Sequence, residues 1–269
     1  MLGSLLDLIR IGSCLRIFLI VYLCLSIWGH IPLMSPSLLT PALALACLAA
    51  GGYALNDHYD VKVDLINTPS RPIPSGRLSQ RFALRAGVGF IIAGLGLCAL
   101  GGPAAAGLGL FDALLLVVYA VHSKRLGWLK TITVCCLHAS IFVFVAVVLN
   151  RFDAGIGLVA MYTFLSTAFY ETIKDERDAR GDRAGGDRTP LTLKLDRRKI
   201  DLAAHAALAA SALLALPLYW FGWGNKLLLI LVPCAAFWFY AASKLERKRA
   251  EWMKLGIVIE VMAIVWGLA

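Results

Sequence analysis

Long apolar runs, separated by short polar segments, make up most of this chain. A helix needs about 20 consecutive apolar residues to cross the hydrocarbon core of a bilayer. The pattern therefore predicts an all-α membrane protein with a single domain over residues 1–269. Nine transmembrane helices are expected, at residues 15–34, 37–56, 82–101, 103–121, 131–149, 155–173, 201–220, 225–243 and 252–268.

Composition supports an integral, multi-pass protein. The 269 residues are 59% hydrophobic with a mean hydropathy of +0.76, which lies outside the usual range of soluble proteins. The first run lacks the short apolar core and cleavage site of a signal peptide, so we expect a retained helix. The seven cysteines lie in or beside apolar runs without metal-ligand spacing, which favours a packing role.

Basic residues gather on one side of the predicted bundle. With nine spans, the N-terminus and every second loop share a side, and this side holds all Lys and Arg except Arg151 and Lys226. Because basic loops stay in the cytoplasm, we expect a cytoplasmic N-terminus and a C-terminus on the opposite side. The net charge of +9 then favours contact with anionic lipid and an anionic substrate. It does not require nucleic acid as a partner.

One acidic motif occurs twice, at residues 56–64 and 174–182, and each copy begins at the end of a predicted helix. The two copies are 118 positions apart, and this offset indicates two four-helix repeats followed by a ninth helix. Such repeats often place a binding site at their interface. The matching pairs are Asp57 with Asp175, Asp60 with Asp178, Asp64 with Asp182 and Pro72 with Pro190.

The spacing of the acids indicates a cation site. Intervals of three and four residues put the three acids of each copy on one helical face, where like charges repel unless a cation lies between them. Oxygen ligands suit a hard cation, and Mg²⁺ combines a few carboxylates with phosphate oxygens of a substrate. The expected ligands are Asn56, Asp57, Asp60, Asp64, Asp175, Asp178 and Asp182, with Asp60, Asp64, Asp178 and Asp182 as the catalytic acids.

Basic residues interleaved with the motifs fit a diphosphate group. Its hydrophobic tail would lie between the helices, and bound metal would stabilise the departing diphosphate. The alternative is an ordinary solvated loop, which we favour for residues 183–201 alone. Asp112 and Glu260 fall inside apolar runs and are either functional or neutral and hydrogen bonded. The interleaved bases are Lys62, Arg71, Arg77, Lys124, Arg125, Lys130, Lys174, Arg177, Arg180 and Arg183, of which Arg71, Arg77, Lys124 and Lys174 are the expected diphosphate-binding residues.

These motifs resemble the two signatures of the UbiA superfamily of intramembrane prenyltransferases. Asn56-Asp57-x-x-Asp60-x-x-x-Asp64, followed by Arg71-Pro72-Ile73-Pro74-Ser75-Gly76, resembles the first, and Lys174-Asp175-x-x-Asp178-x-x-x-Asp182 the second. The resemblance covers almost the whole chain. It implies a helical bundle with a central cavity open to lipid, capped by segments at about 57–81 and 174–200. Two Mg²⁺ ions, bridged by the diphosphate, would hold a polyprenyl diphosphate.

When the site residues of the family are matched to this sequence position by position, the resemblance gives an order among the expected ligands. Asn56, Asp60, Asp178 and Asp182 are the best matches to metal or diphosphate ligands, followed by Asp57, Asp64 and Asp175. Arg71, Lys174 and, more loosely, Lys124 resemble phosphate-binding bases of the family.

The acceptor side departs from the family. Arg10-Ile11-Gly12-Ser13 stands where many members have Arg-Pro-x-Asn, and the usual Gly-Asn is missing near Lys130-Thr131. The run at 71–76 resembles the branch with archaeal digeranylgeranylglyceryl phosphate synthases and the chlorophyll and tocopherol enzymes.

Three functions remain open. The first is prenyl transfer to a hydrophobic acceptor, either an ether-lipid glycerol phosphate or an aromatic ring. The second is a membrane terpene cyclase, in which the same cation reacts within its own chain. The third is a transporter, for which acids deep in the bundle are expected instead of acids at helix ends. Donor chain length, acceptor and oligomeric state are not determined by the sequence.

Overall fold

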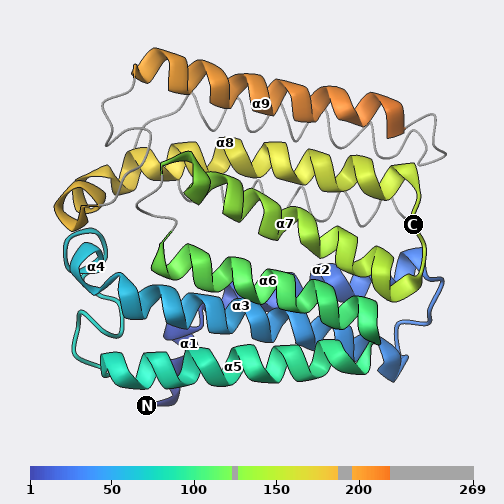
Figure 1. Cartoon of the computed structure of the whole chain (residues 1–269), viewed down its shortest axis with the longest axis horizontal. Helices are drawn as coiled ribbons and strands as arrows, with labels where there is room; N and C mark the ends of the chain where they lie inside the picture. The colour runs from blue at the N-terminus through green and yellow to red at the C-terminus, as the bar shows by residue number, and fades with distance from the viewer. Residues whose placement is uncertain (123–126, 187–195, 219–269) are drawn as a thin grey trace.

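The computed structural model describes residues 1–122, 127–186 and 196–218, and every regular element among them is a helix (Figure 1). The helices are α1 (Leu2–Leu8), α2 (Ile11–Trp28), the short 3₁₀ helix η1 (Pro36–Leu38), α3 (Leu39–Tyr59), α4 (Val61–Asn67), α5 (Gln80–Leu100), α6 (Pro103–Val121), α7 (Trp128–Leu149), α8 (Ala154–Gly185) and α9 (Arg197–Leu218).

Local sequence signals set several helix starts. The Ser79 side chain accepts a hydrogen bond from the Phe82 N–H at 3.1 Å and caps α5. Asp153 caps α8 in the same way, through the Ile156 N–H at 3.0 Å. Helix α6 begins at Pro103, whose missing N–H costs nothing in the first turn.

The apolar pattern predicted the described membrane helices to within a few residues, except that α2 ends at Trp28 and the predicted first span ended at 34. Five helices are long and apolar enough to cross a membrane, namely α2, α3 together with η1, α5, α6 and α7. Helix α8 begins as predicted but continues twelve residues past the expected span end at 173. The spans predicted at 225–243 and 252–268 lie outside the described residues. The helical fold is therefore confirmed, while the nine-helix count, the four-plus-four repeat and the central cavity stay predictions.

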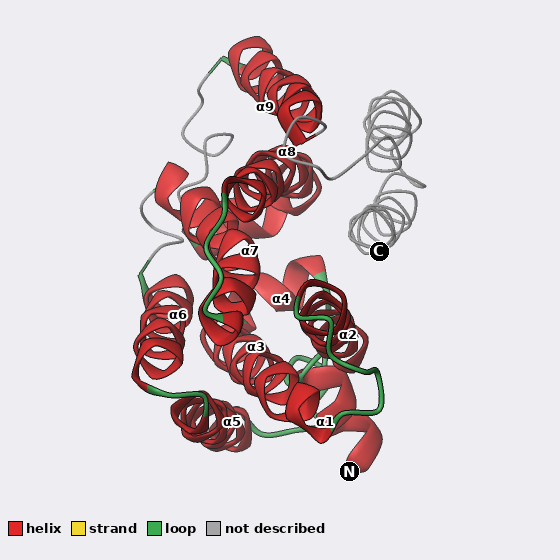
Figure 2. Cartoon of the chain, turned by 90° about the vertical axis from the view of Figure 1, so that its right-hand side faces the viewer, coloured by secondary structure: helices red, strands yellow, loops and turns green. Residues whose placement is uncertain are grey.

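Helix α3 is the centre of the arrangement. It packs against α2, α5 and α6, and α7 in turn contacts α2 and α6. Helix α8 packs between α7 and α9. Seen along the helices, α3 lies among α2, α5 and α6, and α7 lies against α2 and α6 (Figure 2). The first motif, at the end of α3, is thus held by the most enclosed helix of the described part.

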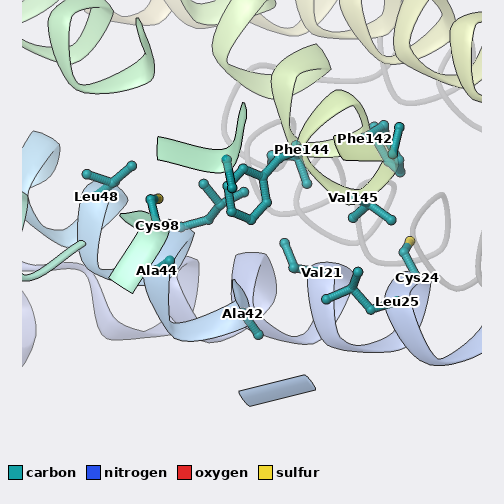
Figure 3. Close-up of a cluster of buried hydrophobic side chains, with 14 of the residues drawn as sticks. Val21, Cys24, Leu25, Ala42, Ala44, Leu48, Cys98, Phe142, Phe144 and Val145 are labelled. Atoms are coloured by element: carbon teal, nitrogen blue, oxygen red, sulfur yellow. The ribbon is translucent and has the colours of Figure 1, made fainter. Parts of the chain in front are cut away.

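The main apolar core joins α2, α3, α5, α6, α7 and the first half of α8, and Figure 3 shows part of it. Its labelled members are Val21, Cys24, Leu25, Ala42, Ala44, Leu48, Cys98, Phe142, Phe144 and Val145. Large apolar side chains also cover the outside of the bundle, among them Ile92, Leu100 and Leu114. An apolar exterior of this kind is what contact with lipid chains requires. The chain is an integral membrane protein.

Gly51 allows α3 and α5 to approach closely. A Cβ at this position would lie 2.8 Å from the Gly87 carbonyl oxygen and 2.9 Å from the Ile91 nitrogen, both backbone atoms of α5. We expect Gly51→Ala to destabilise the protein by about 1–3 kcal/mol, because the helices must separate. Thermal unfolding in detergent measures this loss. Gly89→Ala is the control, since a methyl group at that position would meet nothing within 4 Å; equal melting of both variants would contradict the close approach.

Candidate functional site

The two acidic motifs lie at the same end of the bundle. The first spans the junction of α3 and α4, and the second lies in the C-terminal part of α8 (Figure 1). Helix α4 packs directly against α8. Segments 118 positions apart in the sequence are thereby placed next to each other.

The first motif bends the chain at Asp60 without breaking its hydrogen bonds. Asp60 has φ −91° and ψ 7°, and its N–H still donates to the Asn56 carbonyl at 2.9 Å. The Asp64 N–H then donates to the Asp60 carbonyl at 2.8 Å. Asp57, Asp60 and Asp64 are 2%, 9% and 4% exposed. Three buried carboxylates need nearby cations to be stable.

Two arginines supply this charge to the first motif. The Arg71 Nη1 atom donates to Asp64 Oδ1 and Oδ2 at 2.8 and 2.7 Å and to Asp57 Oδ1 at 3.1 Å. The Arg10 Nη2 atom donates to the same Asp57 oxygen at 2.8 Å. Burial raises the pKa of the Asp64 carboxyl above its ordinary value, and the Arg71 guanidinium opposes this shift.

In the second motif, Lys130 lies beside the acids as Arg71 does in the first. The Lys130 Nζ atom, from the first turn of α7, lies 2.5 Å from Asp175 Oδ1 and 3.8 Å from Asp182 Oδ2. All three residues are buried, with exposures of 6%, 2% and 4% respectively. Helix α8 runs through Asp178, but the side chain of this residue lies outside the described part of the structure.

The other predicted diphosphate-binding bases do not pair with the motif aspartates in the described part of the structure. Lys174 Nζ donates to both carboxylate oxygens of Glu171, at 3.0 and 3.1 Å. Arg77 pairs with Asp7 at 2.6 Å and donates to the Ser70 carbonyl at 2.7 Å, in a well-exposed position. Lys124 lies outside the described residues. The diphosphate-binding roles of these three bases stay predictions.

Two polar residues of this end were not predicted as part of the site. In the sequence Arg10 stands out only as a departure from the family pattern, although its charge reaches Asp57. Glu171 is 2% exposed and lies one helical turn before Asp175. Its spacing of four residues places it on the same face of α8, and this signal could have revealed it.

The first motif contains an unsatisfied ligand atom. Asn56 donates through Nδ2 to Asp60 Oδ2 at 2.8 Å, while its buried Oδ1 has no hydrogen-bond partner among the described residues. An orphaned amide oxygen beside a carboxylate fits a hard cation such as Mg²⁺. Within the described ranges, no three His, Cys, Asp or Glu side chains form a ready metal cluster. Arg71 and Lys130 lie between the acids instead.

Fold and site together define a helical membrane protein with two opposed acidic motifs at one end. The chain belongs to the UbiA prenyltransferase family, whose model matches residues 17–256. It is therefore an enzyme of the prenyltransferase class, and the resemblance carried by its motifs is confirmed.

Individual relatives agree with this family. The digeranylgeranylglyceryl phosphate synthase of Methanoregula boonei is 38% identical over 190 residues, which cover 69% of this chain and 67% of the relative. A structure concerning digeranylgeranylglyceryl phosphate synthase in membranes matches with a TM-score of 0.76 and 23% identity, over 99% of this chain and 98% of the other. A UbiA homologue from Archaeoglobus fulgidus, bound to GPP and Mg²⁺, matches with a TM-score of 0.72 and 14% identity, over 98% of each chain. At these identities the two structures support the fold alone.

Proposed function

We propose that this enzyme transfers a prenyl group from a polyprenyl diphosphate to the hydroxyl of a glycerol-phosphate ether lipid, with Mg²⁺ as the cofactor. The observation that carries the proposal is the meeting of the two motifs, because α4 packs on α8 and brings their buried acids to one end of the bundle, where Arg71 and the buried Lys130 lie beside them. The names of the relatives, digeranylgeranylglyceryl phosphate synthases, support this choice of acceptor. The donor and metal are proposed from the acidic motifs and their neighbouring bases, and the homologue bound to GPP and Mg²⁺ has the same fold.

In this proposal the acidic residues and Asn56 bind the metal, and Arg71 binds the diphosphate. Asn56 and Asp60 on one side and Asp178 and Asp182 on the other would hold Mg²⁺, which supplies charge neutralisation for the departing diphosphate. Arg71, at the rim with a 28% exposed side chain, binds diphosphate oxygens and orients them. The prenyl tail extends into the apolar bundle.

The reaction exchanges one carbon–oxygen bond for another. The bond from prenyl C1 to the diphosphate oxygen breaks, and its electron pair leaves with the diphosphate. The acceptor hydroxyl oxygen forms the new bond to C1 and releases its proton. With the site at the end where the basic residues gather, we propose that donor and acceptor approach from the cytoplasmic side.

Release of pyrophosphate tests this function. Purified protein receives geranyl, farnesyl or geranylgeranyl diphosphate, each alone and with glycerol-phosphate or aromatic acceptors. We expect release that requires both Mg²⁺ and a glycerol-phosphate acceptor, and loss of it when EDTA removes the metal. Release without acceptor, together with a terpene product, would indicate a cyclase. Release only with an aromatic acceptor would overturn the lipid assignment.

A further inference from the structure

Lys130 is an unusual residue for the inside of a membrane helix bundle. Its side chain is 8% exposed, and it enters the site from the first turn of α7, a helix long and apolar enough to span. An ionised ammonium in such a place is costly unless carboxylates surround it. It lies where the family resemblance leads one to expect Gly-Asn, so it is a feature of this chain to be explained.

The contacts of Lys130 repeat those of Arg71 in the other motif. Arg71 joins the first and third acids of the first motif, Asp57 and Asp64. Lys130 approaches the first and third acids of the second motif, Asp175 and Asp182, at 2.5 and 3.8 Å. In each case one cation lies between two carboxylates of the same motif. A divalent metal ion would take a similar position between such groups.

The side chains of Arg71 and Lys130 differ in how easily they can move away from their carboxylates. Arg71 is 28% exposed and comes from a loop, so it can turn toward an anionic ligand. Lys130 is enclosed where α7 packs on α8. Its burial keeps a positive charge beside Asp175 and Asp182 whether or not a substrate is present.

We propose that the Lys130 ammonium takes the place of a metal ion at the second motif, so that the free enzyme binds Mg²⁺ weakly there. A cation entering beside Asp182 meets repulsion from this ammonium at close range and low dielectric. A bound diphosphate adds negative charge that offsets the repulsion, so metal and donor bind cooperatively. This inference rests on the proposed function, because it concerns the same acids.

Mn²⁺ binding, followed by the EPR signal of the free ion, tests the inference on full-length protein without donor. We expect Lys130→Met to bind Mn²⁺ about tenfold more tightly than the unmodified protein, since one nearby positive charge is gone. Lys199→Met is the matched control: it removes the same charge from an exposed position at the start of α9 and should leave the affinity unchanged. Lys130→Arg keeps the charge and should keep the weak affinity.

Thermal unfolding gives a second readout that does not depend on turnover. Without metal, Lys130→Met leaves Asp175 and Asp182 without their neighbouring ammonium and should melt earlier. Added Mg²⁺ should restore its melting temperature and should change that of the unmodified protein less. Lys130→Gln, which keeps a polar side chain but no charge, serves if the methionine variant does not fold.

Three outcomes separate the proposals. Tighter Mn²⁺ binding by the neutral variants, together with rescue of their stability by Mg²⁺, supports the role of Lys130. Unchanged Mn²⁺ affinity would overturn that role while leaving the metal site intact, provided that unmodified protein saturated with a prenyl thiolodiphosphate binds Mn²⁺. No Mn²⁺ binding in any variant, even with this analogue, would overturn the metal site itself and the proposed function with it.

Discussion

Replacing Asp60 with asparagine is expected to reduce prenyl transfer by about a thousandfold or more while the protein remains folded. The substitution preserves the size of the side chain and the bend between α3 and α4, but it removes a carboxylate charge next to the orphaned Asn56 oxygen. Without that charge the site holds Mg²⁺ poorly, and the departing diphosphate loses its main stabilisation. Pyrophosphate release at saturating donor, measured over a range of Mg²⁺ concentrations, quantifies the loss.

Asp7→Asn provides the matched control for this change. Asp7 lies at the same end of the bundle, but its side chain is 55% exposed and forms an ion pair with the exposed Arg77. Exposed ion pairs contribute little, so this variant should work at nearly the normal rate. A normal rate in the Asp60 variant, with unchanged Mg²⁺ dependence, would remove Asp60 from the metal site.

The apolar pattern predicted helix positions well because membrane helices must satisfy their backbone within an apolar run. Helix α6 occupies the predicted residues 103–121. The pattern was less informative about α8, which continues through the second motif to Gly185. Polar residues mark the edge of the membrane, not the end of a helix, and the Glu, Arg and Ala residues that follow Lys174 are good helix formers. The end comes at Gly186, which adopts the left-handed conformation with φ 78°.

The sequence was enough to single out the acids of the candidate site, whereas most of their partners could not be predicted. The aspartates can be recognised from their regular spacing and from the repetition of the motif, because each copy lies within nine consecutive residues. Arg10 and Asp57 are 47 positions apart, and Lys130 and Asp175 are 45 apart. Their pairing depends on how α2 and α7 pack against α3 and α8. No local pattern encodes such contacts, so Lys130 was counted only among the bases interleaved with the motifs, and its position beside two carboxylates was not predicted.

Replacing Arg71 with methionine is expected to raise the KM for the prenyl diphosphate at least tenfold and to lower stability by about 1–3 kcal/mol. Both effects have the same origin. The guanidinium bridges Asp57 and Asp64, and its partly exposed position lets it offer further N–H groups to diphosphate oxygens. Donor titrations of the initial rate give KM, and thermal unfolding gives the stability.

The Arg71 variants separate charge from geometry. Lysine at this position keeps the charge but offers no planar fork, so it should restore most of the stability and only part of the donor affinity. Arg81→Met, on the exposed first turn of α5, removes an arginine from the same end of the bundle and should leave KM unchanged. If Arg71→Met lowers stability but not donor affinity, then Arg71 serves only as the counter-ion of Asp57 and Asp64. The diphosphate would in that case depend on Lys174, whose release from Glu171 would become the event that admits the substrate.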